Sequence, residues 1–192
     1  MAAPLTVATS TGPTRIQLSP TCAFADLVPS DRAHVKPGSF LGITSVEQPD
    51  GSQRAVEIHV FPESMRGAGE GSYPWDWPGA GGSHSAPHSR MTNGTVSASR
   101  MGGSAPHSRM TNGTVSKQGI GSSLTLAYKG AGGAGQQAIV IPPGIPIVTF
   151  VPGTAQDVKP GAHVFVIAAR QANGTLTAAR VAVGKNGLVP PM

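Results

Sequence analysis

Short apolar runs separated by turn-forming residues dominate the chain. The clearest example is HVFVIAARQANGTLTAARVAV, which predicts two strands joined at Asn173-Gly174. Asn-Gly readily adopts the positive φ angles that a tight hairpin needs. Pro49-Asp50-Gly51 holds the same place between two apolar runs in the first third of the chain. The pattern therefore predicts two β-hairpins.

The residues that follow the first turn alternate between apolar and polar positions. Ile58 falls on one face of the expected strand, and Glu57 and His59 fall on the other. Val181 occupies the position of Ile58 in the second hairpin. We expect both hairpins to bury the same face and to expose the other to solvent. On that face, plain solvation of Glu57 and His59 is one interpretation and a pair of metal ligands is the other.

The chain contains an internal repeat. At an offset of 123 residues, Arg15–Val60 aligns with Ala138–Val183 without a gap, and Val-Lys-Pro-Gly at residue 35 falls on the same four residues at 158. Upstream, Leu5–Ala8 resembles Leu124–Ala127 at an offset of 119. Such self-similarity indicates two copies of one structural unit.

The second copy predicts six strands, near 112–116, 123–128, 137–141, 146–151, 162–170 and 175–183. Six short strands within about seventy residues favour a small curled sheet or a partly open barrel, because both limit exposed edges. No stretch has a helical period. We therefore expect an all-β chain with two tandem, small, OB-like, partly open β-barrels.

Composition indicates how the two copies are connected. Among 192 residues, 26 are Gly and 18 are Pro, and these residues are dense between the copies. Such a segment is too polar to build a core. We expect a first barrel over 1–65, a flexible basic linker over 66–109 and a second barrel over 110–192.

Charge and cysteine content restrict the function classes. The net charge of +5 comes mainly from the expected linker, and the strand-like segments lack clustered Lys and Arg with aromatic stacking partners. A nucleic-acid surface therefore remains a minor alternative. Cys22 is the single cysteine, which excludes an intrachain disulfide, and we interpret it as a small buried apolar residue. No apolar run approaches the length of a membrane helix.

The stretch SAPHSRMTNGTVS occurs at Ser85–Ser97 and again at Ser104–Ser116. This identity indicates a recent in-frame duplication. The second occurrence is placed to form the first strand of the second barrel. The first occurrence is either an idle loop or a spare strand, in which Gly94-Thr95-Val96 pairs with 5–8 or 55–60.

The runs FPESMRGAGEG and VGKNGLVPPM, together with KPGSFLGITSVEQPDGSQRAVEIHV and PWD, resemble a bacterial family of exported proteins. These proteins carry tandem OB-like domains of unknown function and are often labelled metal ABC transporter permease. The resemblance implies a periplasmic or secreted protein. The chain starts without a signal peptide, at what resembles the family's second strand, so we expect a truncated start; with a genuine start, the protein is cytoplasmic. The resemblance implies no catalytic or ligand residues.

Histidines and aromatic residues are the candidate site residues. His84, His88 and His107 could gather Cu²⁺, Ni²⁺ or Zn²⁺, although a Gly/Ser-rich segment holds ligands poorly, and solvated side chains are the alternative. The other candidates are the aromatic side chains of SYPWDWPG, namely Tyr73, Trp75 and Trp77. They either pack on the protein itself, stack on a sugar or anchor a partner.

The sequence contains no recognisable catalytic motif, and its Asp and Glu residues are few and scattered. We expect a non-enzymatic binding or structural module without a cofactor, whose partner stays open. The first alternative is a metal-binding accessory protein that uses the linker histidines for weak divalent metal binding. The second is nucleic-acid or saccharide binding on an OB-like barrel. Asn93, Asn112 and Asn173 fit the glycosylation pattern, and we interpret all three as turns.

Overall fold

A computed structural model describes residues 4–9, 12–74, 108–118, 123–130 and 133–191. The described elements are almost all strands, and no helix in these ranges exceeds three residues. The strands are β1 (Leu5–Thr9), β2 (Gly12–Pro29), β3 (Phe40–Glu47), β4 (Gln53–Val60), β5 (Gly71–Pro74), β6 (Ser108–Gln118), β7 (Ser123–Gly130), β8 (Gly133–Val140), β9 (Ile147–Pro152), β10 (Val164–Arg170) and β11 (Leu176–Gly184). The expectation of an all-β chain is confirmed, and the mixed sheet is not closed.

Within the described residues, three short 3₁₀ turns lie between strands, η1 (Arg32–His34), η2 (Glu63–Met65) and η3 (Ala155–Asp157), and a fourth, η4 (Lys185–Gly187), follows β11. The six strands expected in the second copy correspond to β6 through β11. Their observed bounds differ from the expected ones by a few residues, which is the usual uncertainty at strand ends.

The chain divides into two compact units. Unit 1 contains Met1–Val28 and Phe150–Met192, and unit 2 contains Pro29–Thr149. This division does not follow the expected boundaries at residues 65 and 110. The expected linker, 66–109, lies mostly outside the described residues, and its described part contains β5, which pairs with β6.

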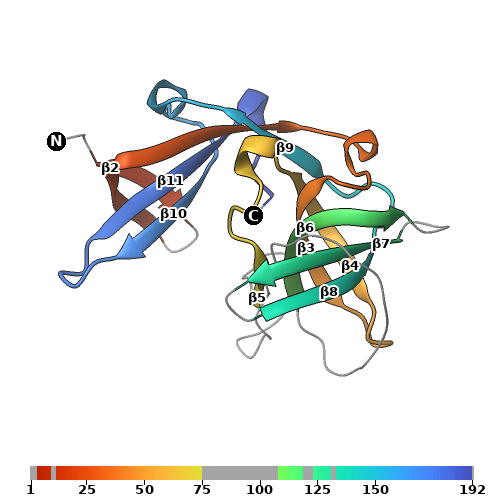
Figure 1. Cartoon of the computed structure of the whole chain (residues 1–192). Helices are drawn as coiled ribbons and strands as arrows, with labels where there is room; N and C mark the ends of the chain where they lie inside the picture. Colours follow the sequence, from red (N-terminus) through yellow and green to blue (C-terminus); the bar gives the residue numbers. More distant parts are fainter. Residues whose placement is uncertain (1–3, 10–11, 75–107, 119–122, 131–132, 192) are drawn as a thin grey trace. The chain divides into compact units, whose positions relative to one another are not determined.

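Unit 1 is built on the long strand β2. β11 runs parallel to β2, and β10 and β1 add antiparallel to β11 and β2, which makes the order β10-β11-β2-β1 (Figure 1). Val181 and Val183 of β11 are buried in its core with Ile16 of β2, and apolar side chains of β1 and β10 pack around them.

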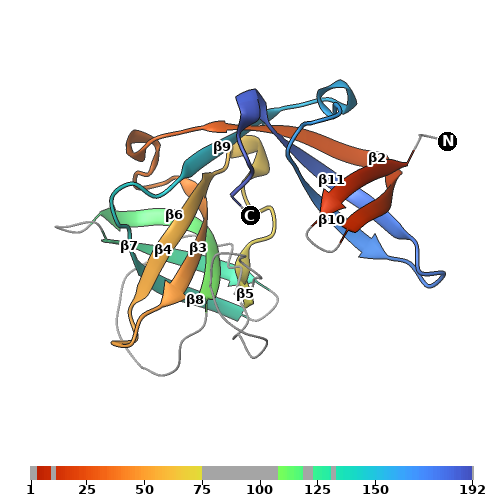
Figure 2. The ribbon, with the colours of Figure 1, turned by 180° about the vertical axis from the view of Figure 1, so that it is seen from behind.

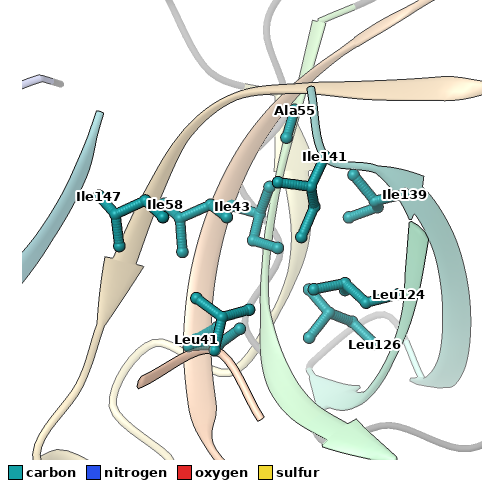
Figure 3. Packing of buried hydrophobic residues seen from close by; sticks show 10 residues of the cluster. Leu41, Ile43, Ala55, Ile58, Leu124, Leu126, Ile139, Ile141 and Ile147 are labelled. Atoms are coloured by element: carbon teal, nitrogen blue, oxygen red, sulfur yellow. The ribbon is translucent and has the colours of Figure 1, made fainter. Parts of the chain in front are cut away.

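Unit 2 has more strands. Its order is β9-β4-β3-β6-β7-β8, with β5 on β6, as Figure 2 shows from behind. β8 also returns to β4 through two parallel residue pairs, Gln53 with Ile139 and Arg54 with Val140. The strands thus curl around one apolar core, drawn in Figure 3, to which β3, β4, β7, β8 and β9 contribute side chains such as Ile43, Ile58 and Leu126.

The two repeats keep the same strand register. In unit 1, Ile16 pairs with Leu176 and Phe24 with Val181. The equivalent pairs of unit 2, at the 123-residue offset, are Ile139 with Gln53 and Ile147 with Ile58. Leu5 pairs with Ile16 as Leu124 pairs with Ile139. The predicted repeat is confirmed at the level of individual residue pairs.

The two hairpin turns are also equivalent. The Gly51 amide donates to the Gln48 carbonyl at 2.8 Å, and the Gly174 amide donates to the Gln171 carbonyl at 2.9 Å. The φ angles of the two glycines are 78° and 82°. Only glycine adopts this region without strain. The prediction of matching turns at Asp50-Gly51 and Asn173-Gly174 is therefore confirmed.

Each unit combines halves of both repeats. Unit 2 joins β3 and β4 of the first repeat to β7 and β8 of the second, and unit 1 joins β1 and β2 of the first repeat to β10 and β11 of the second. The guanidinium of Arg32 donates to the carbonyl oxygens of Ile141 at 2.9 Å and Pro142 at 2.6 Å, which links the two repeats within unit 2. Because each unit contains half of each repeat, the boundaries of the units do not coincide with the boundaries of the repeats.

Candidate functional site

Buried polar side chains concentrate on β3 and β4 of unit 2. Five of the six buried polar or charged residues in the described part lie on these strands, and they are Thr44, Ser45, Gln53, Glu57 and His59. A buried polar group destabilises a fold unless it forms hydrogen bonds. This group is therefore the first candidate site.

A β-bulge separates the polar residues into two groups. Thr44 pairs with Glu57 and the next residue, Ser45, pairs with Ala55, so Val56 is left without a partner in this ladder. One extra residue reverses which face each side chain takes. Ala55 therefore joins Ile58 in the core, while Glu57 and His59 point to the opposite face.

The expectation that Glu57 and His59 are solvated is wrong. Glu57 is 1% exposed and His59 is 2% exposed. Simple alternation predicts which face they share, but it does not predict whether neighbouring segments cover that face. The prediction that Ile58 and Val181 share the same buried phase is confirmed, because both are fully buried.

Burial controls the protonation of Glu57 and His59. The Thr44 hydroxyl donates to Glu57 Oε1 at 2.5 Å, and Glu57 Oε2 accepts no hydrogen bond within the described residues. Desolvation raises the pKa of Glu57 to about 8, and it lowers the pKa of His59 to about 4. Both side chains are therefore neutral near pH 7, and Glu57 can act as a hydrogen-bond donor.

The second polar group forms a chain of hydrogen bonds on the core-facing side. The Ser45 hydroxyl donates to Gln53 Oε1 at 3.0 Å, and Gln53 Nε2 donates to Glu47 Oε2 at 3.3 Å. These bonds satisfy the buried amide at the end of the apolar core. Their geometry is that of a structural network.

Unit 1 replaces almost all of these polar residues. At the 123-residue offset, Ile167 stands for Thr44, Arg180 for Glu57 and Ala182 for His59. The same bulge is present, because Ile167 pairs with Arg180 and Ala168 with Ala178. The fold therefore does not require the polar side chains of unit 2.

Unit 1 has an ion-pair cluster of its own. Lys185 Nζ lies 2.8 Å from Asp26 Oδ2 and 2.5 Å from Asp157 Oδ1. Asp26 is 4% exposed, and a side chain on Gly153 would collide with it. The hydrogen bond from Lys185 and those from Thr154 hold the pKa of Asp157 well below its ordinary value. We interpret this cluster as a structural contact that fixes η3 and η4 to β2.

The strand edges are the second candidate site. In unit 2, β6 pairs with β3 on one side and with β7 on the other. The equivalents of β3 and β7 in unit 1 are β10 and β1. Within the described residues, β10 pairs only with β11, and β1 pairs only with β2. Among the strands that the structure describes, unit 1 therefore has no counterpart of β6.

The structure describes only one of the site residues expected from the sequence. Tyr73 lies on β5, and its hydroxyl donates to the Gly69 carbonyl at 3.0 Å. Burial raises the pKa of Tyr73 above its ordinary value. The choice between packing on the protein itself, stacking on a sugar and anchoring a partner stays a prediction. Trp75, Trp77, His84, His88 and His107 lie outside the described residues.

The metal hypothesis concerns histidines that the structure does not describe, and it stays a prediction. Within the described ranges, no three His, Cys, Asp or Glu side chains gather in a way that could hold a metal ion. Titration calorimetry with Cu²⁺, Ni²⁺ and Zn²⁺ tests the histidines directly.

Comparison with known proteins adds no assignment. No family model matches the chain, and neither a curated protein nor a solved structure matches it. Among the described residues, the chain forms no helix with the length and apolar character that crossing a membrane requires.

Sequence reasoning missed Glu57, His59 and Asp26 as buried polar residues. A signal was available, because the alignment of the two repeats places Glu57 opposite Arg180 and His59 opposite Ala182. Where one copy has a polar residue and the other has an apolar or oppositely charged one, the shared fold does not require that polar residue.

Proposed function

We propose that the protein is a non-enzymatic β-structured binding module, which takes up an extended polypeptide segment along β1 and β10 of unit 1. The observation that carries the proposal is the position of β6 in unit 2, between the equivalents of these two strands. Exposed strand edges bind extended segments through backbone hydrogen bonds.

The repeated register supports this function. Because β3 and β10 carry the same bulge and the same pairing with their hairpin partners, their backbone groups lie in equivalent positions. An extended segment on β10 can therefore pair as β6 pairs with β3. Side chains of alternate residues then decide which sequences are accepted.

The proposal also includes the type of barrel that each unit forms. We infer that unit 2 is a small, partly open, OB-like barrel, in which the parallel pairs between β4 and β8 bring the ends of the curled sheet together. We place unit 1 in the same class, with one strand position left to a ligand. On the resemblance to exported bacterial proteins, the module acts in the periplasm or outside the cell.

A peptide with the sequence of β6, SRMTNGTVSKQ, tests the function. We expect a fluorescein-labelled peptide to bind the protein saturably, as measured by fluorescence anisotropy. The control peptide has the same side chains but is N-methylated at alternate residues, which removes backbone donors, and it should not bind.

The peptide is measured on two proteins, the full chain and a full-length variant in which Gly and Ser replace residues 85–97. The replacement removes the sequence that could compete with the peptide. Absence of binding to both proteins would contradict the proposed function.

A further inference from the structure

Both apolar cores are shared between two parts of the chain. We call the described residues within 4–74 the N-terminal part and those within 108–191 the C-terminal part. The core of unit 2 takes five buried residues from each part, and the core of unit 1 takes Ile16 from the N-terminal part and three buried residues from the C-terminal part. Among the described residues, neither part therefore builds either core alone.

The repeated register offers each part more than one partner. In unit 1, β11 of the C-terminal part pairs with β2 of the N-terminal part. In unit 2, β4 of the N-terminal part pairs in the same register with β8 and β9 of the C-terminal part. Because the N-terminal part contains both β2 and β4, the N-terminal parts of two copies of the chain could pair in this register too. Specific pairing then requires contacts that the wrong partner lacks.

One ion pair joins the two parts within unit 1. Lys185 Nζ of the C-terminal part lies 2.8 Å from Asp26 Oδ2 of the N-terminal part, and the side chain of Asp26 is 6% exposed. A buried carboxylate that loses its cation destabilises a fold strongly. Any pairing that separates Asp26 from a cation is therefore disfavoured.

Pairing between two N-terminal parts would separate Asp26 from a cation. The 123-residue offset, continued past the end of β4, makes Pro62 the equivalent of Lys185. The structure supports this alignment, because the preceding residues, Phe61 and Gly184, donate their amides to equivalent carbonyl groups of the two repeats. Proline carries no charge, so the buried carboxylate would have no counter-ion from this position.

A second contact disfavours pairing between two C-terminal parts. Within unit 2, the guanidinium of Arg32 in the N-terminal part donates to the carbonyl oxygens of Ile141 and Pro142 in the C-terminal part. The equivalent of Arg32 in the C-terminal part is Ala155, which has no side-chain donor. Two C-terminal parts would therefore lose both hydrogen bonds.

We propose that the ion pair between Asp26 and Lys185, supported by Arg32, selects the partner of each part, so that an N-terminal part pairs with a C-terminal part and not with the like part of a second copy. The surface between the two parts then holds them together without a covalent link. This inference goes beyond the proposed function, because it concerns the pairing that builds both units and not the binding of a ligand.

Splitting the chain tests the selection without changing a residue. Residues 1–90 and 91–192 are produced together as two polypeptides, so the whole sequence is present. Two forms of the first polypeptide, one with a histidine tag and one with a streptavidin-binding tag, compete for the second polypeptide. Affinity purification on one tag, followed by native mass spectrometry, determines how often each complex forms.

We expect complexes of one first polypeptide with one second polypeptide, and complexes of two first polypeptides should be at least about tenfold rarer. The melting temperature of the split protein should rise with protein concentration, whereas that of the intact chain should not. Equal frequencies of the two kinds of complex would overturn the inference. Failure of the two polypeptides to associate would also overturn it.

The substitution Asp26→Thr tests the ion pair itself, because threonine is the residue at the equivalent position, Thr149. The variant lacks the buried carboxylate, so complexes of two first polypeptides should become at least about fivefold more frequent. Asp31→Thr is the matched control, because it replaces an exposed aspartate of the same part by its own equivalent, Thr154. The control should leave the frequency of these complexes unchanged, and equal frequencies in the two variants would overturn the role of Asp26.

Discussion

Unit 1 and unit 2 have the same strand register but differ in their further strands and in their polar side chains. Both have the same parallel pairing, the same bulge and the same turn. Unit 2 adds β6 and carries Glu57 and His59 on the far side of β4, whereas unit 1 carries an exposed Ile167 and a Lys185 ion-pair cluster. The features that the two units share are those that fold the chain, and the features that differ are candidates for function.

The largest expected effect concerns the shared core. Val181→Asp and Ile58→Asp each place an unpaired charge at a fully buried position, and each should reduce the free energy of unfolding by about 3–5 kcal/mol. Urea denaturation measures the losses. Arg180→Asp, at a half-buried position on the other face of β11, should cost under about 1 kcal/mol. Equal losses for Val181→Asp and Arg180→Asp would mean that the strand phase is wrong.

The second prediction concerns the polar residues that only unit 2 carries. Folding raises the pKa of Glu57 from 4.5 to about 8, so stability should fall as pH rises across this range, because only the unfolded chain then releases the proton. Folding lowers the pKa of His59 from 6.5 to about 4, so its effect has the opposite sign below pH 6.5. The effects of Glu57 and His59 on stability oppose each other between pH 4.5 and 6.5. Between pH 6.5 and 8, only the loss of stability caused by Glu57 remains.

Glu57→Gln should abolish this fall, because glutamine does not titrate. We expect the variant to gain stability relative to the wild type as pH rises from 6.5 to 8, by up to a few kcal/mol. Urea denaturation at pH 5, 6.5 and 8 measures the difference. Glu63→Gln, at an exposed carboxyl of η2, is the matched control. An unchanged slope in Glu57→Gln would show that Glu57 is ionised in the folded protein.

The third prediction concerns the ion-pair cluster that only unit 1 carries. Lys185→Met removes the cation from the buried carboxylate of Asp26 and should lower the melting temperature. The double variant Asp26→Asn/Lys185→Met should recover part of this loss, because it leaves no buried charge. Thermal unfolding at constant pH compares the wild type, the single variants Asp26→Asn and Lys185→Met, and the double variant. A loss in the double variant equal to the sum of the single losses would indicate that Asp26 and Lys185 do not interact.

The smallest expected effect concerns the two turns. Gly51→Ala and Gly174→Ala introduce a side chain at positive φ and should each cost about 1 kcal/mol. Because the turns are equivalent, the two losses should agree within about 0.5 kcal/mol. Ala172→Gly, at an exposed position beside the second turn, controls for turn flexibility. Clearly unequal losses would show that the turns differ in strain.

Sequence patterns predicted much of the fold but little of the site. The hairpins were predictable because Asn-Gly and Asp-Gly have strong local preferences, and the repeat was predictable because both copies keep their apolar positions. Glu57 was misjudged because alternation reports which face a side chain takes, whereas burial depends on segments distant in sequence. The bulge at Val56 was not predicted either, because it leaves no local sequence signal as strong as a Gly turn.

The sequence alone determined the strands, the turns, the repeat and the equivalence of Ile58 with Val181, because these depend on local conformational preference and apolar periodicity. The tertiary structure decided which repeat halves pack together. Each hairpin could pair with the first half of either repeat, since both halves offer the same register. Contacts between distant residues select one arrangement. The difference between the units at β6, which has no counterpart among the described strands of unit 1, is likewise visible only in the tertiary structure.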